Sequence, residues 1–361
     1  MSTTLNSGID PASFSAVTGP AQDLFRYVNG PWIDMYRLPD DRSRYGSFDK
    51  LAEDAENQIR EILEDDDCPA EKSHALYASF LDVDAINASG LAAIEDQLKA
   101  IDVAADKAEL TRSLGAMNPA GGPDLIGIAV YGDPGAPETN IIHIEQSGLG
   151  LPDEAYYRED HYAPIREAYV DMVAKQLKNA KLAADDEQAE AQAQRFLDVE
   201  TRIAANHWDN VATRDSVKTY NPTDYAELSG MLADYDLDTW IDAWQTAYDQ
   251  TSAAQVQPLD FRGIFNHVVV HEPSFLTGLN AFWKAADLDD LKLWARVHVI
   301  IGSTLELPHE FDETNFEFYG KTLSGQKQQR VRWKRGVSLV NGICGEDVGR
   351  EYVKRHFPES S

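Results

Sequence analysis

The stretch SFDKLAEDAENQIREIL, residues 47–63, indicates the helical character of this chain. Its apolar side chains recur at intervals of three and four; they are Phe48, Leu51, Ala55, Ile59 and Ile62. That spacing places them on one face of an α-helix, with acidic residues on the other. Ser47 stands at the expected N-cap, because a serine hydroxyl can accept a free N–H of the first turn. The stretch therefore predicts an amphipathic helix that follows the loop 37–46.

Helices are predicted along most of the chain by the same periodicity. The run CPAEK (68–72) ends the first helix and opens the next, and alanine-rich helices continue to about residue 116. Apolar repeats predict two more helices, over 164–177 and over 185–208. A last helix is predicted over 342–358, where a proline ends it.

Two residues within these helical regions carry their own predictions. His207 lies on the apolar stripe of the helix 185–208, and we expect it to be packed and hydrogen bonded rather than to bind a ligand. Pro222, in YNPTDYAEL (220–228), predicts a helix start, because proline is tolerated in a first turn.

One region has the period of β-structure. DLIGIAVYG (124–132) and NIIHIEQSG (140–148) are rich in apolar and β-branched residues, and DPGAPET separates them. They predict a β-hairpin at 124–148 whose loop is longer than a tight turn. The fold class expected from the whole chain is mainly α, with this small β-hairpin as its sheet element.

The charge of the chain excludes several classes of partner. Its 361 residues include 61 acidic and 32 basic residues, which gives a net charge of −29. Such a field repels phosphate backbones and anionic bilayers, so neither nucleic acid nor a membrane is expected as a partner. No window approaches about 18 uninterrupted apolar residues, and the N-terminus lacks the basic and apolar parts of a secretory signal.

The cysteine content indicates a reducing compartment. Cys68 and Cys344 are the two cysteines of the chain, too few for a disulfide framework. They fit reduced thiols, and we therefore expect a cytoplasmic protein.

Two His-Glu pairs resemble the start of the zinc-binding motif H-E-x-x-H. HEPSF (271–275) has Phe275 at the position of the second histidine, and HEFDE (309–313) has Glu313 there. Two histidine ligands on one helix need the i, i+4 spacing, so neither stretch meets it. Pro273, together with the extended conformation expected for the residues before it, predicts that His271 flanks a helix start. We therefore expect no catalytic residue and no metal ligand on this chain; motifs for serine or cysteine nucleophiles and phosphate loops are absent as well.

Six ordered blocks carry a resemblance to a known family. They are DLFRYVNGPWID (23–34), RSRYGSFDKL (42–51), SGLGLPDEAYY (147–157), RDSVKTYNP (214–222), FYGKTLSG followed by RWKR (318–335), and EYVKRHFPE (351–359). Together they resemble the N-terminal half of the neprilysin-like (M13) zinc metallopeptidases, from about residue 20 to the end of the chain.

The resemblance implies a two-lobed, mainly helical peptidase of which this chain supplies the multi-helical capping lobe. It implies a leader at 1–19 that is flexible, a helical lobe at 20–317, and a segment at 318–361 that leads towards a catalytic lobe. In the family, the zinc ligands and the N-A-[FY]-[FY] substrate motif follow the last block. We therefore expect zinc in the full-length enzyme, none on this chain, and no substrate role for NAFW (280–283), which fits the amphipathic helix 275–286.

The resemblance also assigns a substrate-binding role to Arg44. It matches an arginine that faces the family's cavity and pairs with the C-terminal carboxylate of a peptide, which a guanidinium engages through two parallel hydrogen bonds. Asp49, five residues on, is expected to brace it. The alternative is an ordinary salt bridge between the loop and the helix. The family's second basic position falls on Ala52, which puts a two-arginine clamp in doubt.

Other residues of the blocks are expected to be structural. Arg332, Lys334 and Arg335 of RWKR form a cationic patch whose natural partners are buried carboxylates or helix C-termini. Without a second lobe, several apolar side chains are expected to lose their covering: Tyr27, Trp32, Trp333, Val348 and Tyr352.

These observations predict the N-terminal, substrate-enclosing region of an M13-type zinc metalloendopeptidase that acts on oligopeptides. The expected partners are peptide substrates and the missing catalytic half, and the segment alone is expected to be inactive. Two alternatives stay open: a stand-alone peptide-binding protein, and a regulatory subunit that pairs with a separate catalytic half.

Overall fold

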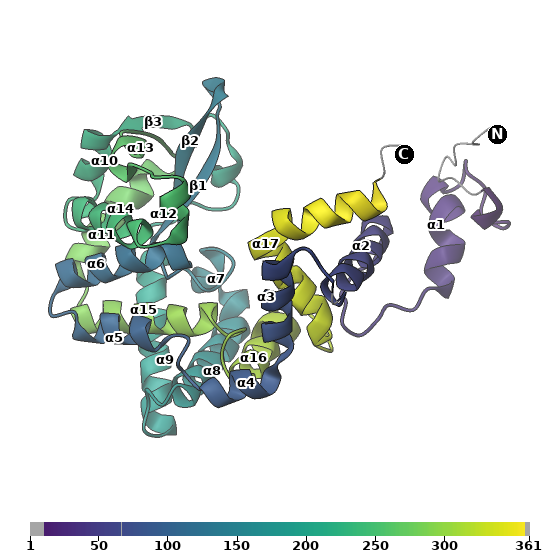
Figure 1. The fold of residues 1–361 in the computed structure, drawn as a ribbon, viewed down its shortest axis with the longest axis horizontal. Coiled ribbons are helices and arrows are strands. Elements are labelled where there is room, and N and C mark those ends of the chain that lie inside the picture. Colours follow the sequence, from purple (N-terminus) through teal and green to yellow (C-terminus); the bar gives the residue numbers. More distant parts are fainter. Residues whose placement is uncertain (1–10, 66, 358–361) are drawn as a thin grey trace.

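The computed structural model describes residues 11–65 and 67–357, and it confirms a mainly α fold with a small sheet. Figure 1 shows a large helical body with the sheet at one end, a smaller group formed by α2, α3 and α17, and helix α1 standing apart from both. The first ten residues of the expected leader lie outside the described residues, and the division at 19 and 317 stays a prediction.

The α-helices follow one another along the chain. They are α1 (Leu24–Met35), α2 (Ser47–Leu63), α3 (Glu71–Leu81), α4 (Val83–Ser89), α5 (Glu95–Val103), α6 (Lys107–Met117), α7 (Ala155–Arg158), α8 (Ala163–Asn179), α9 (Asp186–Ala204), α10 (Tyr225–Met231), α11 (Leu237–Asp249), α12 (Ser252–Val256), α13 (Phe261–Ile264), α14 (Pro273–Ala285), α15 (Leu288–Gly302), α16 (His309–Asn315) and α17 (Arg332–His356). Short 3₁₀ turns are η1 (Pro11–Ser13), η2 (Asn118–Ala120), η3 (Asp160–Tyr162) and η4 (Ala212–Arg214), and η5 (Phe316–Leu323) is a π-helix.

Aspartate caps many of these helices. A carboxylate accepts a backbone N–H three residues on at Asp23, Asp82, Asp106, Asp185, Asp224, Asp236 and Asp260. A negative charge at a helix N-terminus also offsets the positive end of the helix dipole. Part of the acidic composition is therefore structural.

The predicted hairpin is confirmed, but its loop is tighter than expected. Strand β1 (Ile126–Asp133) pairs antiparallel with β2 (Ala136–Gln146), which leaves Pro134 and Gly135 between them. The Asp133 carboxylate accepts the Gly135 N–H at 2.8 Å and the Tyr220 hydroxyl at 2.8 Å, and these bonds hold the turn closed.

The sheet is larger than the hairpin alone. Its order is β1-β2-β4-β3: β4 (His267–Val270) runs parallel to β2, and β3 (Asn221–Asp224) runs antiparallel to β4. The helix start predicted at Pro222 is wrong, because Pro222 lies in the edge strand β3 and Asp224 caps α10 instead. An edge strand tolerates proline because one side of its backbone needs no strand partner.

The predicted long helices are largely confirmed. The range 164–177 falls within α8, whereas α9 ends at Ala204 rather than near Trp208. The last helix begins at Arg332, earlier than expected, and bends at Cys344, whose backbone is non-helical (φ −124°, ψ 25°). Pro358, the predicted stop, lies outside the described residues.

The described residues form two hydrophobic cores. The larger one fills the body around the fully buried rings of Trp240, Trp283 and Trp294. The smaller one joins α2, α3 and α17 and contains Ile62, Leu63, Cys68, Ala70, Tyr77, Val337, Val340 and Val348. The exposure expected for Val348 is therefore wrong: it is 1% exposed, because it belongs to this second core. Tyr27, Trp333 and Tyr352 are half-buried, and Trp32 is 43% exposed.

The apolar face predicted for α2 is divided between core and solvent. Ile59 and Ile62 pack in the smaller core, whereas Phe48 is 87% exposed and Leu51 is 64% exposed. The predicted Ser47 cap is wrong: Ser47 is the first helical residue, and Gly46 stands at the N-cap without a side-chain bond.

The RWKR patch meets both kinds of partner predicted for it. Arg335 donates to the buried carboxylate of Asp312 at 2.6 Å, and Arg332 donates to the carbonyl of Phe80 near the C-terminus of α3 at 2.7 Å. Burial lowers the pKa of Arg332, and the neighbouring Arg335 lowers it further. The Arg335–Asp312 bond joins the two bodies, because Asp312 belongs to α16 and Arg335 to α17, whereas the Arg332–Phe80 bond joins α17 to α3 within the smaller group.

Candidate functional site

The candidate site is the loop between α1 and α2, where Arg44 was predicted to bind substrate. Three aromatic rings order this loop. Trp32 stacks on Tyr36 with ring centroids 4.7 Å apart, and Tyr36 stacks on Tyr45 at 4.5 Å. Because Trp32 and Tyr36 lie at the end of α1, the stack ties that helix to the residues that lead into α2.

Arg42 forms the ion pairs between this loop and α2. Its guanidinium lies 3.4 Å from Asp49 and 3.1 Å from Glu53, and the Tyr45 hydroxyl donates to Glu53 at 2.8 Å. Burial raises the pKa of Glu53, but the bond from Tyr45 and the charges of Arg42 and Lys334 outweigh it and leave that pKa below its ordinary value. Glu53 in turn raises the pKa of Tyr45 through their hydrogen bond.

Arg44 takes no part in this network. Its side chain is exposed, and no hydrogen bond or ion pair joins it to the described residues. The described residues show no bond between Asp49 and Arg44; one Asp49 carboxylate oxygen lies 3.4 Å from Arg42 instead. The ordinary loop-to-helix salt bridge exists, but Arg42 makes it and Arg44 does not. The substrate-binding role of Arg44 and Asp49 stays a prediction.

Arg44 lies in an exposed segment that contains one charged and one apolar side chain without a partner among the described residues. The guanidinium is free to form a bidentate bond with a carboxylate. The Phe48 ring is 87% exposed in the first turn of α2, so an apolar surface lies in the same segment. Ala52, where a second basic residue was considered, is exposed and carries no charge.

The His-Glu pair of HEPSF lies at the junction of β4 and α14. The prediction that His271 flanks a helix start is confirmed, since α14 begins at Pro273. His271 Nε2 lies 2.8 Å from Nδ1 of His143 in β2, and the Glu272 carboxylate accepts the Gln146 N–H at 3.0 Å. Burial raises the pKa of Glu272 to about 7 and lowers the pKa of His271.

His143 is a member of this cluster that the sequence did not single out. The parallel pairing of β2 with β4 sets His143 opposite Val269, two residues before His271. No local sequence pattern predicts the pairing of two strands that lie more than a hundred residues apart in the sequence. The Nε2 atom of His143 is buried without a hydrogen-bond partner in the structure.

These residues do not fit a zinc site. Because His143 and His271 bond directly to each other, their facing nitrogens share one proton. Among residues 11–65 and 67–357, no three His, Cys, Asp or Glu side chains converge as metal ligands do. In HEFDE, the Asp312 carboxylate is engaged by Arg335.

His207 and NAFW have the structural roles predicted for them. His207 lies 3.0 Å from the Ser147 carbonyl and contacts Phe275 edge-on, and burial lowers its pKa to about 4. In α14, Phe282 and Trp283 are buried, and Asn280 accepts the backbone N–H groups of residues 234 and 235.

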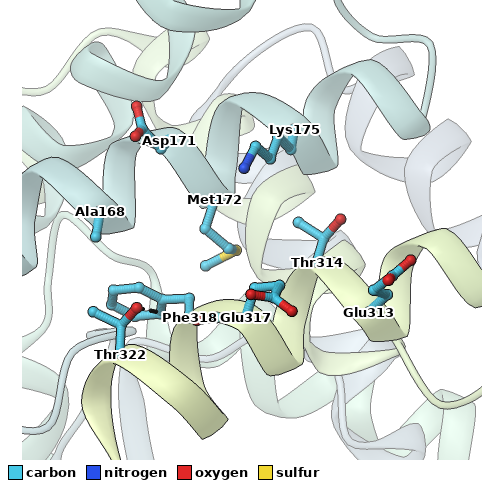
Figure 2. A pocket seen from close by; sticks show the side chains of 9 residues that line it. All are labelled: Ala168, Asp171, Met172, Lys175, Glu313, Thr314, Glu317, Phe318 and Thr322. Carbon is cyan, nitrogen blue, oxygen red and sulfur yellow. Dashed lines mark hydrogen bonds between the residues drawn. The ribbon is translucent and has the colours of Figure 1, made fainter. Parts of the chain in front are cut away.

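A pocket of about 420 Å³ lies between α8 and the α16–η5 segment (Figure 2). Met172 and Phe318 are the buried, apolar part of its lining. Asp171, Glu313 and Glu317 are exposed, with Lys175 as the one cation among the lining residues. The pocket is an open acidic hollow without a nucleophile or a metal-ligand set, so it does not compete with the Arg44 segment as the candidate site.

The comparisons with known proteins identify the family. The sequence profile of peptidase family M13 matches residues 20–361, so the chain belongs to that family and contains its N-terminal region. It is 26% identical to human neprilysin, over 97% of this chain and 49% of that protein. It is 28% identical to the membrane metallo-endopeptidase-like 1 of Mus musculus, over 95% of this chain and 46% of that protein.

A solved structure supports the same assignment. The chain superposes on the zinc metalloprotease Zmp1 of Mycobacterium tuberculosis, solved with an inhibitor, with a TM-score of 0.86 and 34% identity. The match covers 98% of this chain and 53% of that one. The fold is therefore the mainly α lobe of M13 peptidases. The chain spans about half the length of the curated relatives it matches.

Proposed function

We propose that residues 20–361 form the substrate-enclosing N-terminal region of a zinc metalloendopeptidase that acts on oligopeptides. The family membership supports the peptidase class. The observation that carries the substrate role is the exposed guanidinium of Arg44, unpaired among the described residues, in the same loop as the aromatic stack. In this proposal Arg44 binds the C-terminal carboxylate of the peptide and orients its chain, and a defined orientation lowers the entropic barrier to cleavage.

The catalytic chemistry is assigned to another part of the enzyme. A zinc ion polarises a water molecule and a carbonyl in such peptidases. Because the described residues offer no convergent ligand set, the zinc would be held by a catalytic half outside them. This chain alone is accordingly proposed to be inactive and to hold no stoichiometric zinc.

In two alternative functions, this chain takes part in binding but not in peptide cleavage. A stand-alone protein would capture peptides through Arg44, and a regulatory subunit would dock on a separately encoded catalytic half. A cytoplasmic location and the lack of membrane and nucleic-acid partners remain predictions. Within the described part of the chain, none of the helices combines the length and apolarity of a membrane span.

Two measurements on the natural protein test the proposal. An intact mass should correspond to about twice 361 residues, as for the relatives, and the same sample should cleave oligopeptides until a chelator removes its metal. If the protein isolated from its source has 361 residues and binds peptides without cleaving them, the stand-alone binding protein would be favoured. The same protein in a stable complex with a catalytic chain would favour the subunit. Chelator-resistant zinc at about one ion per purified 361-residue chain, together with peptidase activity, would contradict the assignment of catalysis to another part.

A further inference from the structure

Strand β1 forms an open edge of the sheet. The strand order is β1-β2-β4-β3, so β1 pairs with β2 on one side only. The hairpin of β1 and β2 projects from the large body (Figure 1). Val130 and Tyr131, towards its tip, are 64% and 57% exposed.

The register shows which backbone groups of β1 point outwards. The Ile144 carbonyl accepts the His271 N–H at 2.9 Å, so the polar groups of Ile144 face the β4 side of β2. In an antiparallel ladder the N–H and C=O of one residue point to the same side. Ile144 is paired with Ile128, and Ile142 with Val130, so the backbone groups of Ile128 and Val130 point away from β2.

These outward groups have no strand partner. Among the described residues, no backbone hydrogen bond joins Ile128 or Val130 to an element other than β2. The N–H of Ile126, which has the same orientation, is already bound by the Asp124 carboxylate at 3.2 Å. The free stretch therefore centres on Ile128 and Val130.

Over residues 126–132, the edge lacks the charges and prolines that normally keep edge strands from pairing. Soluble proteins guard such strands with charges, prolines or short length. The opposite edge, β3, has four residues and contains Pro222. In β1 the run IGIAVYG (126–132) contains no charged residue and no proline, and its small residues Gly127 and Ala129 leave the backbone accessible.

We propose that the β1 edge binds an extended peptide segment with an apolar, β-branched centre and basic ends. The segment would add a fifth strand beside β1, bonded to the outward groups of Ile128 and Val130. The basic ends follow from charge: Glu145 lies at the base of the hairpin and Glu138 near its tip, on a chain of net charge −29. A second copy would bring the same net charge of −29, so the charge favours a basic peptide over a second copy at this edge.

This inference goes beyond the proposed function and does not depend on it. The segment is recognised mainly through its backbone, and side chains on one face of it would extend the apolar row of Ile128 and Val130. The contact uses the backbone of Ile128 and Val130 and not Arg44, so failure of one proposal leaves the other standing.

Residue-resolved amide exchange of the 361-residue chain tests the proposal. The probe is acetyl-Lys-Val-Thr-Val-Thr-Val-Lys-amide. We expect it to slow exchange at Ile128 and Val130 by at least about fivefold, because their N–H groups become bonded. Ala129 and Tyr131, which already face β2, should change little. Acetyl-Lys-Val-Thr-Pro-Thr-Val-Lys-amide and a peptide with glutamate at both ends should protect much less.

Two variants control for indirect effects. Val130→Pro removes one outward N–H and no β1–β2 bond, so it should abolish protection by the probe; the unchanged exchange of Ala129 would show that the hairpin persists. Val130→Thr keeps the N–H and should respond like the natural chain.

Four outcomes would overturn the proposal. With peptide, these are equal protection by the proline-containing peptide, or protection that does not alternate along β1. Without peptide, these are protection of Ile128 and Val130 that increases with protein concentration, or protection of both at every concentration. The third would assign the edge to a second copy, and the fourth would show that the chain itself covers it.

Discussion

The carboxylate of Glu200, which is fully buried, lies 2.8 Å from Nε2 of His298. The same carboxylate accepts the Gly150 N–H at 2.8 Å and the Tyr157 hydroxyl at 2.9 Å. Glu200 on α9 therefore fixes the SGLGLPD turn against α15. This arrangement gives a structural reason for a block whose glycines could otherwise suggest a phosphate site.

Glu200→Ala should destabilise the large body. The change leaves the Gly150 N–H, the Tyr157 hydroxyl and the His298 ring without their shared acceptor. Buried donors left unpaired cost about 2–4 kcal/mol in the free energy of unfolding. Urea unfolding measures this loss. Glu190→Ala, an exposed change on the same helix, should stay within about 0.5 kcal/mol of the natural chain. Equal stability of the two variants would contradict the role of Glu200.

His207 should make stability depend on pH. Burial lowers its pKa from 6.5 to about 4 in the folded chain, because the charged ring is poorly solvated there. The folded state therefore binds its proton less readily than the unfolded state. Its stabilising contribution is complete above about pH 6.5 and is lost as the pH falls towards about 4, by about 2–3 kcal/mol.

The measurement compares unfolding free energies of the natural chain and His207→Gln from pH 7 to pH 4.5. Glutamine can still donate to the Ser147 carbonyl but does not titrate, so the difference between the two proteins should shrink as the pH falls. Comparing variants cancels the opposite contributions of Asp124 and Glu272, each of which has a folded pKa of about 7. His161→Gln, which replaces a histidine whose side chain is 65% exposed, is the control for the loss of an imidazole elsewhere on the chain.

The helical elements were predictable because their signals are local. Apolar repeats such as those of α8 and α9 depend on residues three and four apart, and burial in the large core enforces them. Strands β3 and β4 have four residues each, and their partners lie far away in the sequence. No short-range pattern could therefore reveal the four-stranded sheet or the contact of His143 with His271.

The Arg44 segment shows the same limit at the candidate site. The six blocks pointed to this loop, but they could not show which arginine pairs with Asp49. Arg42 and Arg44 are two residues apart in an irregular loop, and no periodic pattern there indicates which of them pairs with α2. Likewise, the spacing of apolar residues in α2 predicted which face is apolar. It could not predict which part of that face the smaller core covers, because this depends on where α17 lies.

Arg44→Ala should weaken the binding of free-acid peptides in the full-length enzyme. If Arg44 pairs with the terminal carboxylate, the loss should be about 1.5–3 kcal/mol, or about 10- to 150-fold in kcat/KM. Peptides with an amidated C-terminus lack that charge and should be affected little. Arg37→Ala is the matched control, an exposed arginine of the same loop, and should leave both substrates unchanged. Equal losses for acid and amide would assign Arg44 to structure.

Helix α1 should exchange its amides faster than the rest of the fold in the 361-residue chain. Leu24, Phe25 and Met35 are each more than 60% exposed, and the contacts of α1 with the loop before α2 are mainly the aromatic stack. Apolar surface that stays exposed contributes none of the stabilisation, about 25 cal/mol per Å², that burial would give. The free energy of locally opening α1 is therefore small. We expect its amides to exchange at least about 100-fold faster than those of 187–203 in α9.

A catalytic half added in trans should slow the exchange of α1 if it covers the exposed face, as the proposed function requires. Without it, the same face should promote self-association, measurable by sedimentation, and Phe25→Ser with Met35→Ser should reduce that association. The buried part of α17 around Val337 and Val340 should stay protected in either sample, because the smaller core already covers it. If a monomeric sample exchanged α1 as slowly as 187–203, the helix would be self-sufficient. That result would favour the stand-alone peptide-binding protein over the N-terminal region of a peptidase.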